Sequence, residues 1–303
     1  MIKAIVTTTI NSPTTAIKKF DKLKDWKLIV IGDLKTPKNY KLKNGIYVSP
    51  KEQEHIDKKL SNLIGWNCIQ RRNMGLLVAK NIKADVIALI DDDNIPYKNW
   101  GENLLVGRKS EAISYKTKNN CFDPIFVTNY PMLWHRGFPI QNLSQRSINS
   151  KSSGIIKPDI QADFWNGDPD IDAICRMIHK PECSFKKKYF PFFSNKISPF
   201  NSQNTFLNSK VLKNYFLFPH VGRMDDIWAS FYVQAKKAKV IYNSASVYQQ
   251  RNPHDLTVDM KKEYKGYEYN YKILDAIYKK PDSLFNFLPK RSLQAYEQYL
   301  KHF

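Results

Sequence analysis

An apolar segment that ends abruptly in carboxylates constrains the fold of this chain more than any other feature. The run Val86–Ile90 consists of aliphatic residues, and Asp91, Asp92, Asp93 and Asn94 follow it directly. A short continuous apolar run is typical of a strand buried in a parallel sheet. Ligands of open α/β sheets lie at the carboxyl ends of the strands. The segment therefore predicts a buried strand whose carboxyl end opens into a polar site.

The spacing of the acidic residues after this strand favours a metal ion. Asp91 and Asp93 are two residues apart, so on an extended backbone their side chains share one face. Two carboxylates on one face repel each other unless a cation lies between them. Mn²⁺ or Mg²⁺, which also holds diphosphates, suits such oxygen ligands. The alternative is an acidic turn, because Asp and Asn favour turns, and this segment alone leaves both interpretations open.

The composition predicts a soluble globular protein. The chain has 303 residues, of which 42% are hydrophobic, enough for one large core. No apolar run reaches the length that spans a bilayer, and the first residues resemble a strand rather than a secretory signal. The four cysteines have neither CxxC nor zinc-site spacing, so we expect them to be reduced. These features predict a cytoplasmic location.

The net charge of +20 predicts anionic partners. Nucleotide diphosphates, acidic or lipid-diphosphate-linked glycans and anionic membrane surfaces all meet this description. The densest basic cluster, Phe185–Phe193, interleaves lysines with aromatic residues. It could contact an anionic membrane at the inner face, but we favour a solvated loop beside a core cluster. No RNA- or DNA-binding motif accompanies the charge, so we expect no nucleic-acid partner.

The order of predicted elements indicates an α/β fold with a doubly wound, mostly parallel sheet. Strands are expected at 2–9, 26–31, 46–48 and 86–90, and helices at 51–64 and 67–82 lie between them in sequence. A first helix is expected after Ser12 as N-cap, with Pro13 at its first position. Residues 110–210 are irregular and rich in Pro, Asn, Ser and aromatic residues. Helical patterns return at 226–237 and from 258 onward, and a strand is expected at 239–242.

Polar residues also follow the first two predicted strands. The hydroxyls of Thr7, Thr8 and Thr9 could hydrogen-bond a nucleobase, although threonine favours strands in any case. An acidic residue such as Asp33, at the end of the second strand, often binds a ribose hydroxyl in doubly wound folds, and Lys35 could reach a phosphate. A simple Gly-Asp turn explains the same residues equally well.

Further candidates lie on predicted helices. Arg72 and Asn73 precede the acidic strand, and arginine provides the forked donors that suit a diphosphate. Asp225 and Asp226 open a late helix, where capping is the alternative role. His254 could complete a metal shell or contact a phosphate, but a lone histidine is more often structural.

A cluster of carboxylates precedes the helix expected from Ala173. Asp168 and Asp170 belong to the segment Asn166–Ala173. A carboxylate at a helix start is ordinary capping chemistry, and that explains one member of the cluster. The others point to a hydroxyl-rich or cationic ligand.

Taken in order, these segments resemble the STELLO-like glycosyltransferases, known from plant Golgi proteins and microbial relatives, and more distantly the reversibly glycosylated polypeptides. The segments that carry the resemblance are TTTINSPT (7–14), GDLKTP (32–37), RNMG (72–75), DDDN (91–94), RGFP (136–139), NGDPDIDA (166–173), NSQNT (201–205), DIW (226–228) and QRNPH (250–254). They run from residue 7 to residue 254 in family order. No single segment is decisive, but the ordered set is specific.

The resemblance implies a GT-A fold, a UDP-sugar donor, a divalent cation at an Asp-x-Asp motif, and transfer to a glycan or lipid-linked acceptor. The expected metal ligands are Asp91, Asp93 and His254. The expected donor contacts are Thr7, Thr8, Thr9, Asp33, Lys35, Arg72, Asn73, Asp91 and Asp92. The expected sugar or acceptor contacts are Arg136, Asp168, Asp170, Asn204 and Arg251. Asp226, or Asp225 beside it, is the expected general base if the reaction inverts.

The resemblance also suggests how the chain is divided. Residues 1–255 would form the GT-A domain, with a nucleotide-sugar-binding half at 1–110 and an acceptor-side half at 111–255. Residues 256–303 would form a helical extension packed on it, and the chain would be a free-standing catalytic core. Two other functions remain open, a nucleotide-sugar mutase and a non-catalytic scaffold of a glycan synthase.

Overall fold

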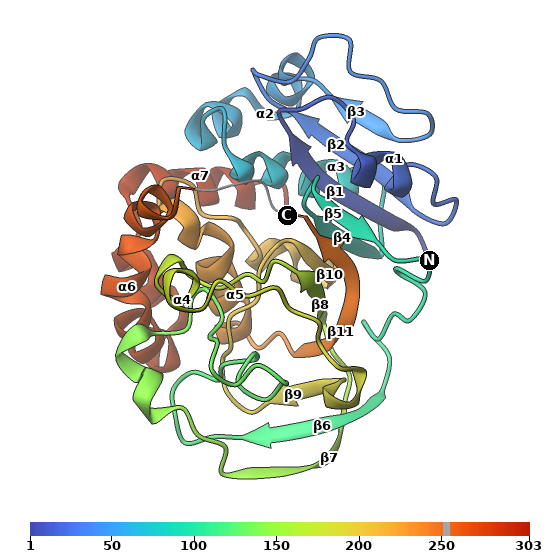
Figure 1. The fold of residues 1–303 in the computed structure, drawn as a ribbon. Helices are drawn as coiled ribbons and strands as arrows, with labels where there is room; N and C mark the ends of the chain where they lie inside the picture. The colour runs from blue at the N-terminus through green and yellow to red at the C-terminus, as the bar shows by residue number, and fades with distance from the viewer. Residues whose placement is uncertain (251–254) are drawn as a thin grey trace.

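One mixed sheet forms the centre of the molecule (Figure 1). The computed structural model describes residues 1–250 and 255–303. The strand order in the sheet is β3-β2-β1-β4-β10-β8-β11-β9-β6-β7, and β5 pairs with β11 outside this path. Strands from the first and second halves of the chain therefore share one sheet, and β4 and β10 join them.

The first half is a parallel α/β unit. Strands β1 (Lys3–Thr9), β2 (Lys27–Gly32), β3 (Ile46–Val48) and β4 (Val86–Ile90) pair in parallel. Their aliphatic residues form much of the core, and every residue of β4 is buried. Helices α1 (Thr15–Phe20), α2 (Pro50–Ile64) and α3 (Arg72–Asn81) connect them. The predicted fold class is confirmed by this arrangement.

Helix α3 approaches the sheet closely because one of its positions is a glycine. A Cβ atom built on Gly75 would lie 2.4 Å from Cγ1 of Val6 and 3.0 Å from Cγ1 of Ile31. Only a residue without a side chain permits this approach. The helix therefore holds its amino-terminal end, with Arg72, beside the carboxyl end of β4.

The second half extends the sheet with mixed pairing. β10 (Asn204–Asn208) is antiparallel to β4 and to β8 (Ile160–Gly167), while β11 (Val240–Gln249) is parallel to β8. The predicted strand at 239–242 is thus the start of a longer strand. The remaining strands are β5 (Asn94–Pro96), β6 (Ser110–Lys116), β7 (Ser150–Ile156) and β9 (Phe192–Ser194).

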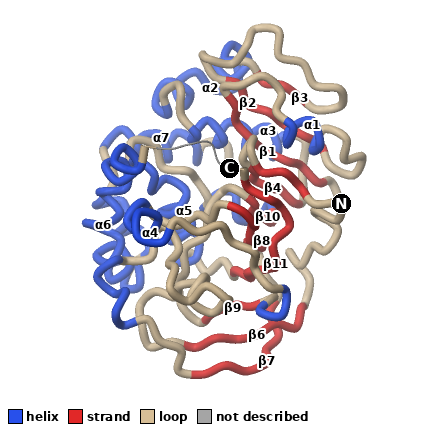
Figure 2. Tube along the Cα trace, in the orientation of Figure 1, coloured by secondary structure: helices blue, strands red, loops and turns tan. Residues whose placement is uncertain are grey.

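Figure 2 shows the later helices gathered on one side of the strands. They are α4 (Ala173–His179), α5 (Asp225–Ala235), α6 (Leu256–Lys279) and α7 (Lys290–Leu300). Short 3₁₀ helices lie at Ile69–Arg71, Ile140–Gln145, Lys187–Tyr189, Ser209–Asn214, Gly222–Met224 and Pro281–Phe287. Helix α6 packs against α4 and α5, and α7 packs against α2. Within the described residues, every helix is too short or too polar to cross a membrane.

Two local predictions were wrong. The N-cap of α1 is Thr14 rather than Ser12, because Thr14 Oγ1 accepts a hydrogen bond from the Ile17 amide at 3.2 Å. The helix expected over 67–82 is a 3₁₀ turn at Ile69–Arg71 followed by α3. The proposed division at residues 110 and 255 stays a prediction.

Candidate functional site

An acidic pocket of about 270 Å³ lies at the carboxyl ends of β4 and β11 and the amino terminus of α5. Its lining residues are Ile69, Asp91, Asp93, Arg136, Gln203, Gly222, Arg223, Asp225, Asp226 and Gln249. Distant parts of the sequence meet here because β10 runs antiparallel to β4, which brings Gln203 beside Asp91. This is the edge of the sheet at which the sequence predicted a polar site.

The acidic run after β4 forms a turn rather than an extended strand. Asp91 and Asp93 nevertheless line the same pocket, and Asp92 points elsewhere. Asp92 Oδ2 accepts hydrogen bonds from Thr9 Oγ1 at 2.5 Å and from Asn11 Nδ2 at 3.3 Å. Burial raises the pKa of Asp92 above its ordinary value. Asp92 therefore anchors the turn to the end of β1 and leaves the other two carboxylates at the pocket.

Arg72 stabilises this turn through hydrogen bonds to Asp91 and Ser202. Its Nη2 pairs with Oδ1 of Asp91, and its Nη1 donates to both the carbonyl and the hydroxyl of Ser202 at 2.7 Å. The guanidinium is almost fully buried. Arg72 therefore positions Asp91. Because its guanidinium is buried, it exposes no N–H group for the diphosphate contact that was expected of it.

A buried ion cluster forms one wall of the pocket. Arg136 Nε and Nη2 donate to the two oxygens of Asp170 at 2.7 and 3.0 Å. Arg136 Nη1 and Nη2 donate to the two oxygens of Asp226 at 3.1 Å each. Asp226 also accepts from the Ser202 amide at 3.0 Å. One arginine thus joins two carboxylates that are far apart in sequence, and the cluster carries more negative than positive charge.

Asp225 has a different environment from its neighbour. Its Oδ2 accepts a hydrogen bond from Gln70 Nε2 at 2.9 Å, the Asp226 backbone amide also donates to this carboxylate, and the residue is 3% exposed. Burial, together with the negative charge of Asp226, raises the pKa of Asp225. A carboxyl group with a raised pKa and few donors can take up a proton near neutral pH.

The predicted nucleoside contacts lie outside the lining of the acidic pocket. The side chain of Asp33 accepts hydrogen bonds from the Asn67 amide at 2.7 Å and the Cys68 amide at 3.1 Å. Thr9 is engaged with Asp92, and Thr7 is fully buried. Thr8 is half-buried and Lys35 is exposed, so these two remain accessible. Asp33 therefore stabilises the turn before α3.

Two residues predicted to bind ligand are buried and hydrogen-bonded within the fold. Asn73 is fully buried, and its amide group exchanges hydrogen bonds with the backbone of Leu217 at 2.8 and 2.9 Å. Asn204 is also fully buried and bonds Trp100, the Phe164 carbonyl and Ser246. Neither side chain can reach a ligand in the pocket, because other parts of the fold use all its hydrogen-bonding atoms.

The remaining predicted residues fall into two groups. Asp168 forms an ion pair with Arg176 and is not part of the Arg136 cluster, which Asp170 joins instead. Arg251 and His254 lie outside the described residues. The acceptor contact expected of Arg251 and the metal contact expected of His254 therefore stay predictions.

Several lining residues were not predicted individually. Gln203 lies within the segment 201–205 that the sequence singled out, and Arg223 and Gln249 lie within a few positions of predicted site residues. Their role depends on strand pairing and on the helix α5 terminus. The adjoining motifs were the only sequence signal that could have found them.

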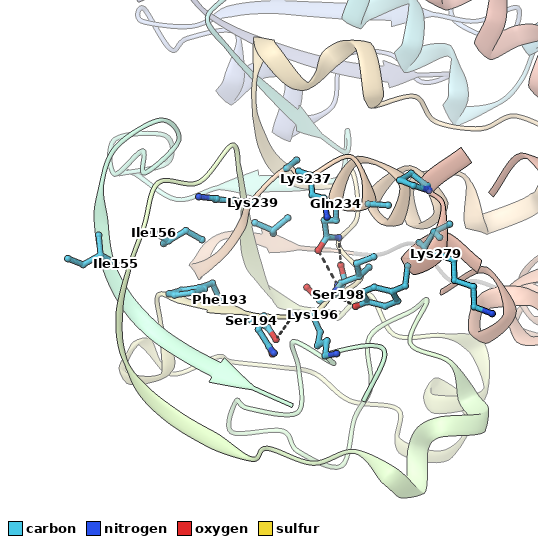
Figure 3. Close-up of a pocket in the computed structure, with 18 residues that line it drawn as sticks. Ile155, Ile156, Phe193, Ser194, Lys196, Ser198, Gln234, Lys237, Lys239 and Lys279 are labelled. Carbon is cyan, nitrogen blue, oxygen red and sulfur yellow. Dashed lines mark hydrogen bonds between the residues drawn. The ribbon is translucent and has the colours of Figure 1, made fainter. Parts of the chain in front are cut away.

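A second pocket, shown in Figure 3, has a different character. Its volume is about 510 Å³, and Lys196, Lys237, Lys239 and Lys279 line it together with apolar residues such as Phe193. No carboxylate or histidine is among the described residues that line it. Its described lining offers neither a carboxylate nor an imidazole as a base, so the acidic pocket is the better candidate for catalysis.

The acidic pocket suits a hard divalent cation. Asp91 and Asp93 supply carboxylate oxygens, and Gln203 and Gln249 supply amide groups. Among the residues that the structure describes, no three His, Cys, Asp or Glu side chains are grouped closely enough to hold a metal alone. Mg²⁺ commonly binds through one or two carboxylates and completes its shell with substrate phosphates and water. The residues present therefore fit a metal that binds together with a diphosphate.

Comparisons with known proteins agree with the resemblance seen in the sequence. The chain is 25% identical over 241 residues to the probable glycosyltransferase STELLO2 of Arabidopsis thaliana and 24% identical to the probable glycosyltransferase STELLO1 of the same plant. Both matches cover 73% of this chain. The chain spans about a third of the length of these relatives, 32% and 31%. No known family model matches the chain.

Solved structures offer more distant likenesses. A structure of glucosyl-3-phosphoglycerate synthase from Mycobacterium tuberculosis with Mn²⁺ and UDP-glucose has a TM-score of 0.40 at 13% identity, covering 95% of this chain and 80% of that one. A structure of the same enzyme with Mn²⁺, UDP and phosphoglyceric acid has a TM-score of 0.42 at 11% identity, covering 92% and 78%.

Proposed function

From its similarity to the STELLO glycosyltransferases, we infer that this chain is a STELLO-like glycosyltransferase. We propose that it moves a sugar from a UDP-sugar to a glycan or lipid-linked glycan acceptor, with Mn²⁺ or Mg²⁺ as cofactor, in surface polysaccharide synthesis. The observation that carries the proposal is that Asp91, Asp93 and Asp225 line one pocket at the carboxyl edge of the sheet. The net charge of +20 supports an acidic acceptor and a place of action in the cytoplasm beside anionic lipids.

On the donor side, the turn after β4 holds the diphosphate end of the nucleotide. Arg72 bonds both Asp91 and Ser202, and Thr9 hydrogen-bonds Asp92. These bonds hold the turn in place before the donor binds. Asp93, assisted by Asp91, is the principal residue that would hold the metal. When bound, the cation would offset the charge that develops on the leaving nucleotide.

On the acceptor side, Asp225 is better suited than Asp226 to act as general base. Both oxygens of Asp226 are engaged by Arg136, and one also accepts from Ser202, so these neighbours already occupy the carboxylate. Asp225 lines the same pocket and has a raised pKa. If transfer inverts the anomeric centre, Asp225 would accept the proton of the acceptor hydroxyl. Asp226 would hold Arg136 in place.

The first experiment is calorimetric titration of UDP and of a panel of UDP-sugars, with Mn²⁺ and with chelator. We expect binding that requires the metal and that Asp93→Asn abolishes. Asp25→Asn is the matched control, because the Asp25 side chain is 85% exposed and distant from the pocket lining. If UDP, GDP and CMP donors all fail to bind in the presence of Mn²⁺, the scaffold function replaces this proposal.

Nuclear magnetic resonance of donor and enzyme alone would reveal ring isomerisation and so identify a mutase.

The base assignment is tested by comparing Asp225→Asn with the wild type over a range of pH. The base must be deprotonated to work, so the wild-type rate should fall as pH drops through the raised pKa of Asp225. We expect Asp225→Asn to lower the transfer rate about 10²–10⁴-fold, while UDP affinity changes little. Transfer at the wild-type rate in Asp225→Asn would exclude this residue as the base.

A further inference from the structure

A third pocket has lining residues on the same pair of strands, β8 and β11, and is lined mainly by neutral hydrogen-bonding groups. Its volume is about 520 Å³, within the range of small-molecule sites. The neutral polar lining residues are Asn99, Asn103, Gln161, Asn166, Asn243, Ser244 and Ser246, and the aromatic ones are Tyr97 and Phe185. Asp163 and Lys187 are the only charged side chains among the described residues that line it. The pocket shares no lining residue with the acidic pocket.

An irregularity in the sheet opens this pocket. Between the paired positions Asn243–Asp163 and Val247–Trp165, β11 contains three residues where β8 contains one. Such bulges redirect side chains and are common next to active sites. The bulge is held in place, because the Tyr97 amide donates to the Ser246 carbonyl at 3.0 Å and Asn204 Nδ2 donates to Ser246 Oγ at 2.9 Å. Residues 244–246 therefore face the pocket from a fixed backbone.

A buried carboxyl group forms part of the pocket lining. Asp163 is 5% exposed and accepts a hydrogen bond from Gln161 Nε2 at 2.7 Å. The side chains of Ser246 and Asn243 also bond to it. Burial raises the pKa of Asp163 to about 7, so near neutral pH it can both donate and accept hydrogen bonds. A polar group this deeply buried is costly unless it has partners, and here three pocket side chains provide them.

An aromatic side chain lies at the rim. Tyr97 is 36% exposed, and its hydroxyl accepts a hydrogen bond from Asn166 Nδ2 at 3.0 Å. The hydrogen bonds at both ends of Tyr97 hold the ring in one orientation without hiding it. A fixed and partly exposed ring offers an apolar surface beside the amide groups.

The position of the pocket connects it to the catalytic candidate. Asn166 lines this pocket and directly precedes Gly167, which pairs in register with Gln249 of β11. Gln249 lines the acidic pocket. The two pockets therefore lie at neighbouring positions of the same pair of strands.

We propose that this pocket, which we call the amide pocket, binds a sugar unit of the acceptor chain remote from the unit that receives the donor sugar. This inference rests on the proposed function and specifies its substrate as an oligosaccharide or longer glycan. Amide and hydroxyl groups pair with sugar hydroxyls as both donors and acceptors. The Tyr97 ring packs against the C–H face of the sugar. Because charged groups are few in this pocket, it suits a neutral sugar unit, and any acidic groups of the acceptor would lie elsewhere along its chain.

The test is saturation-transfer nuclear magnetic resonance on the full chain with cellohexaose, maltohexaose, mannohexaose and xylohexaose. We expect at least one oligosaccharide to bind, and Tyr97→Ala and Asn243→Ala to weaken its binding by about tenfold or more. Tyr264→Ala is the matched control, because Tyr264 is 63% exposed on α6 and lines neither pocket. Thermal melting of each variant confirms that it is folded.

A parallel UDP titration of the same variants separates this inference from the proposed function. The amide-pocket variants should bind UDP as the wild type does. If UDP binds but none of the four oligosaccharides does, or if Tyr97→Ala and Asn243→Ala bind sugar as tightly as Tyr264→Ala, the inference is wrong and the proposed function stands. If oligosaccharides bind and nucleotides do not, the proposed function fails and the amide pocket remains a glycan site.

Discussion

Arg136 connects the parts of the site that the sequence keeps apart. It hydrogen-bonds Asp170, which follows β8, and Asp226, in the first turn of α5. Burial lowers the pKa of this guanidinium, but the two carboxylates outweigh that effect and raise it above the ordinary value. Arg136 therefore remains charged, and its charge is what allows two carboxylates to remain buried beside the pocket.

We predict that Arg136→Ala destabilises the protein by about 3–5 kcal/mol, because it removes the guanidinium that pairs with two buried carboxylates, Asp170 and Asp226. Urea denaturation at pH 7 measures the change in the free energy of unfolding. Arg108→Ala is the control, because Arg108 is exposed and should change stability by less than about 0.5 kcal/mol. Equal losses in the two variants would contradict the structural role assigned to Arg136.

At the scale of elements, the starts of helices and the ends of strands provide most of the site. The turn after β4, the N-terminal turn of α5 and the end of β11 each contribute pocket residues. Helix α1 is linked to the same turn, because Thr14 caps the helix and also donates from Oγ1 to the Asp92 carbonyl at 2.5 Å. The position of the turn that carries Asp91 and Asp93 therefore depends partly on a helix that contributes no lining residue.

The corrected N-cap gives a direct test at this scale. Thr14→Ala removes both the cap and the bond to the Asp92 carbonyl, so we expect a loss of about 1–2 kcal/mol in the free energy of unfolding. Ser12→Ala should cost little, because Ser12 is exposed and lies before the cap. Thermal denaturation of the two variants shows which residue caps α1. A larger loss of stability in Ser12→Ala than in Thr14→Ala would favour Ser12, the N-cap predicted from the sequence.

At the scale of the whole molecule, charge and sheet continuity matter most. One sheet joins the first half of the chain to the second through the β4–β10 pairing, so the acidic pocket is built from residues of both halves. The chain has 48 Lys and Arg against 28 Asp and Glu, and this excess of positive charge attracts anions. The same positive charges repel one another, which destabilises the folded state. The acidic pocket is thus a local negative site in a positive molecule, which suits the capture of a cation together with an anionic donor.

Because added salt screens the repulsion between the many positive side chains, we predict that it stabilises the folded protein in the absence of ligand. Raising the NaCl concentration from 10 to 150 mM shortens the screening length from about 30 to about 8 Å. We expect Tm to rise by about 2–4 °C, equivalent to roughly 1 kcal/mol. Lys58→Glu with Lys59→Glu, at two exposed positions of α2, lowers the net charge and should reduce the salt response. A Tm that is independent of salt in the wild type would show that the charges are already balanced locally.

Local sequence by itself determined the strands of the first half and the edge of the sheet where the acidic pocket lies. Continuous aliphatic runs such as Val86–Ile90 predict buried parallel strands, and carboxylates directly after them predict a polar edge, because both depend on neighbours in the chain. Patterns of this kind also found the segments that contain Asp91, Asp93 and Asp225, and the ordered motifs revealed the resemblance to known glycosyltransferases.

Tertiary structure alone decided which of these polar residues face the pocket. Asn73 and Asn204 look like ligand contacts in the sequence, yet the Leu217 backbone and Trp100 occupy their amide groups. Arg136 and Asp226 are 90 residues apart, and only the folding of the chain brings them together. Local propensity acts over a few residues, whereas the engagement of a polar side chain depends on partners that folding brings from distant positions.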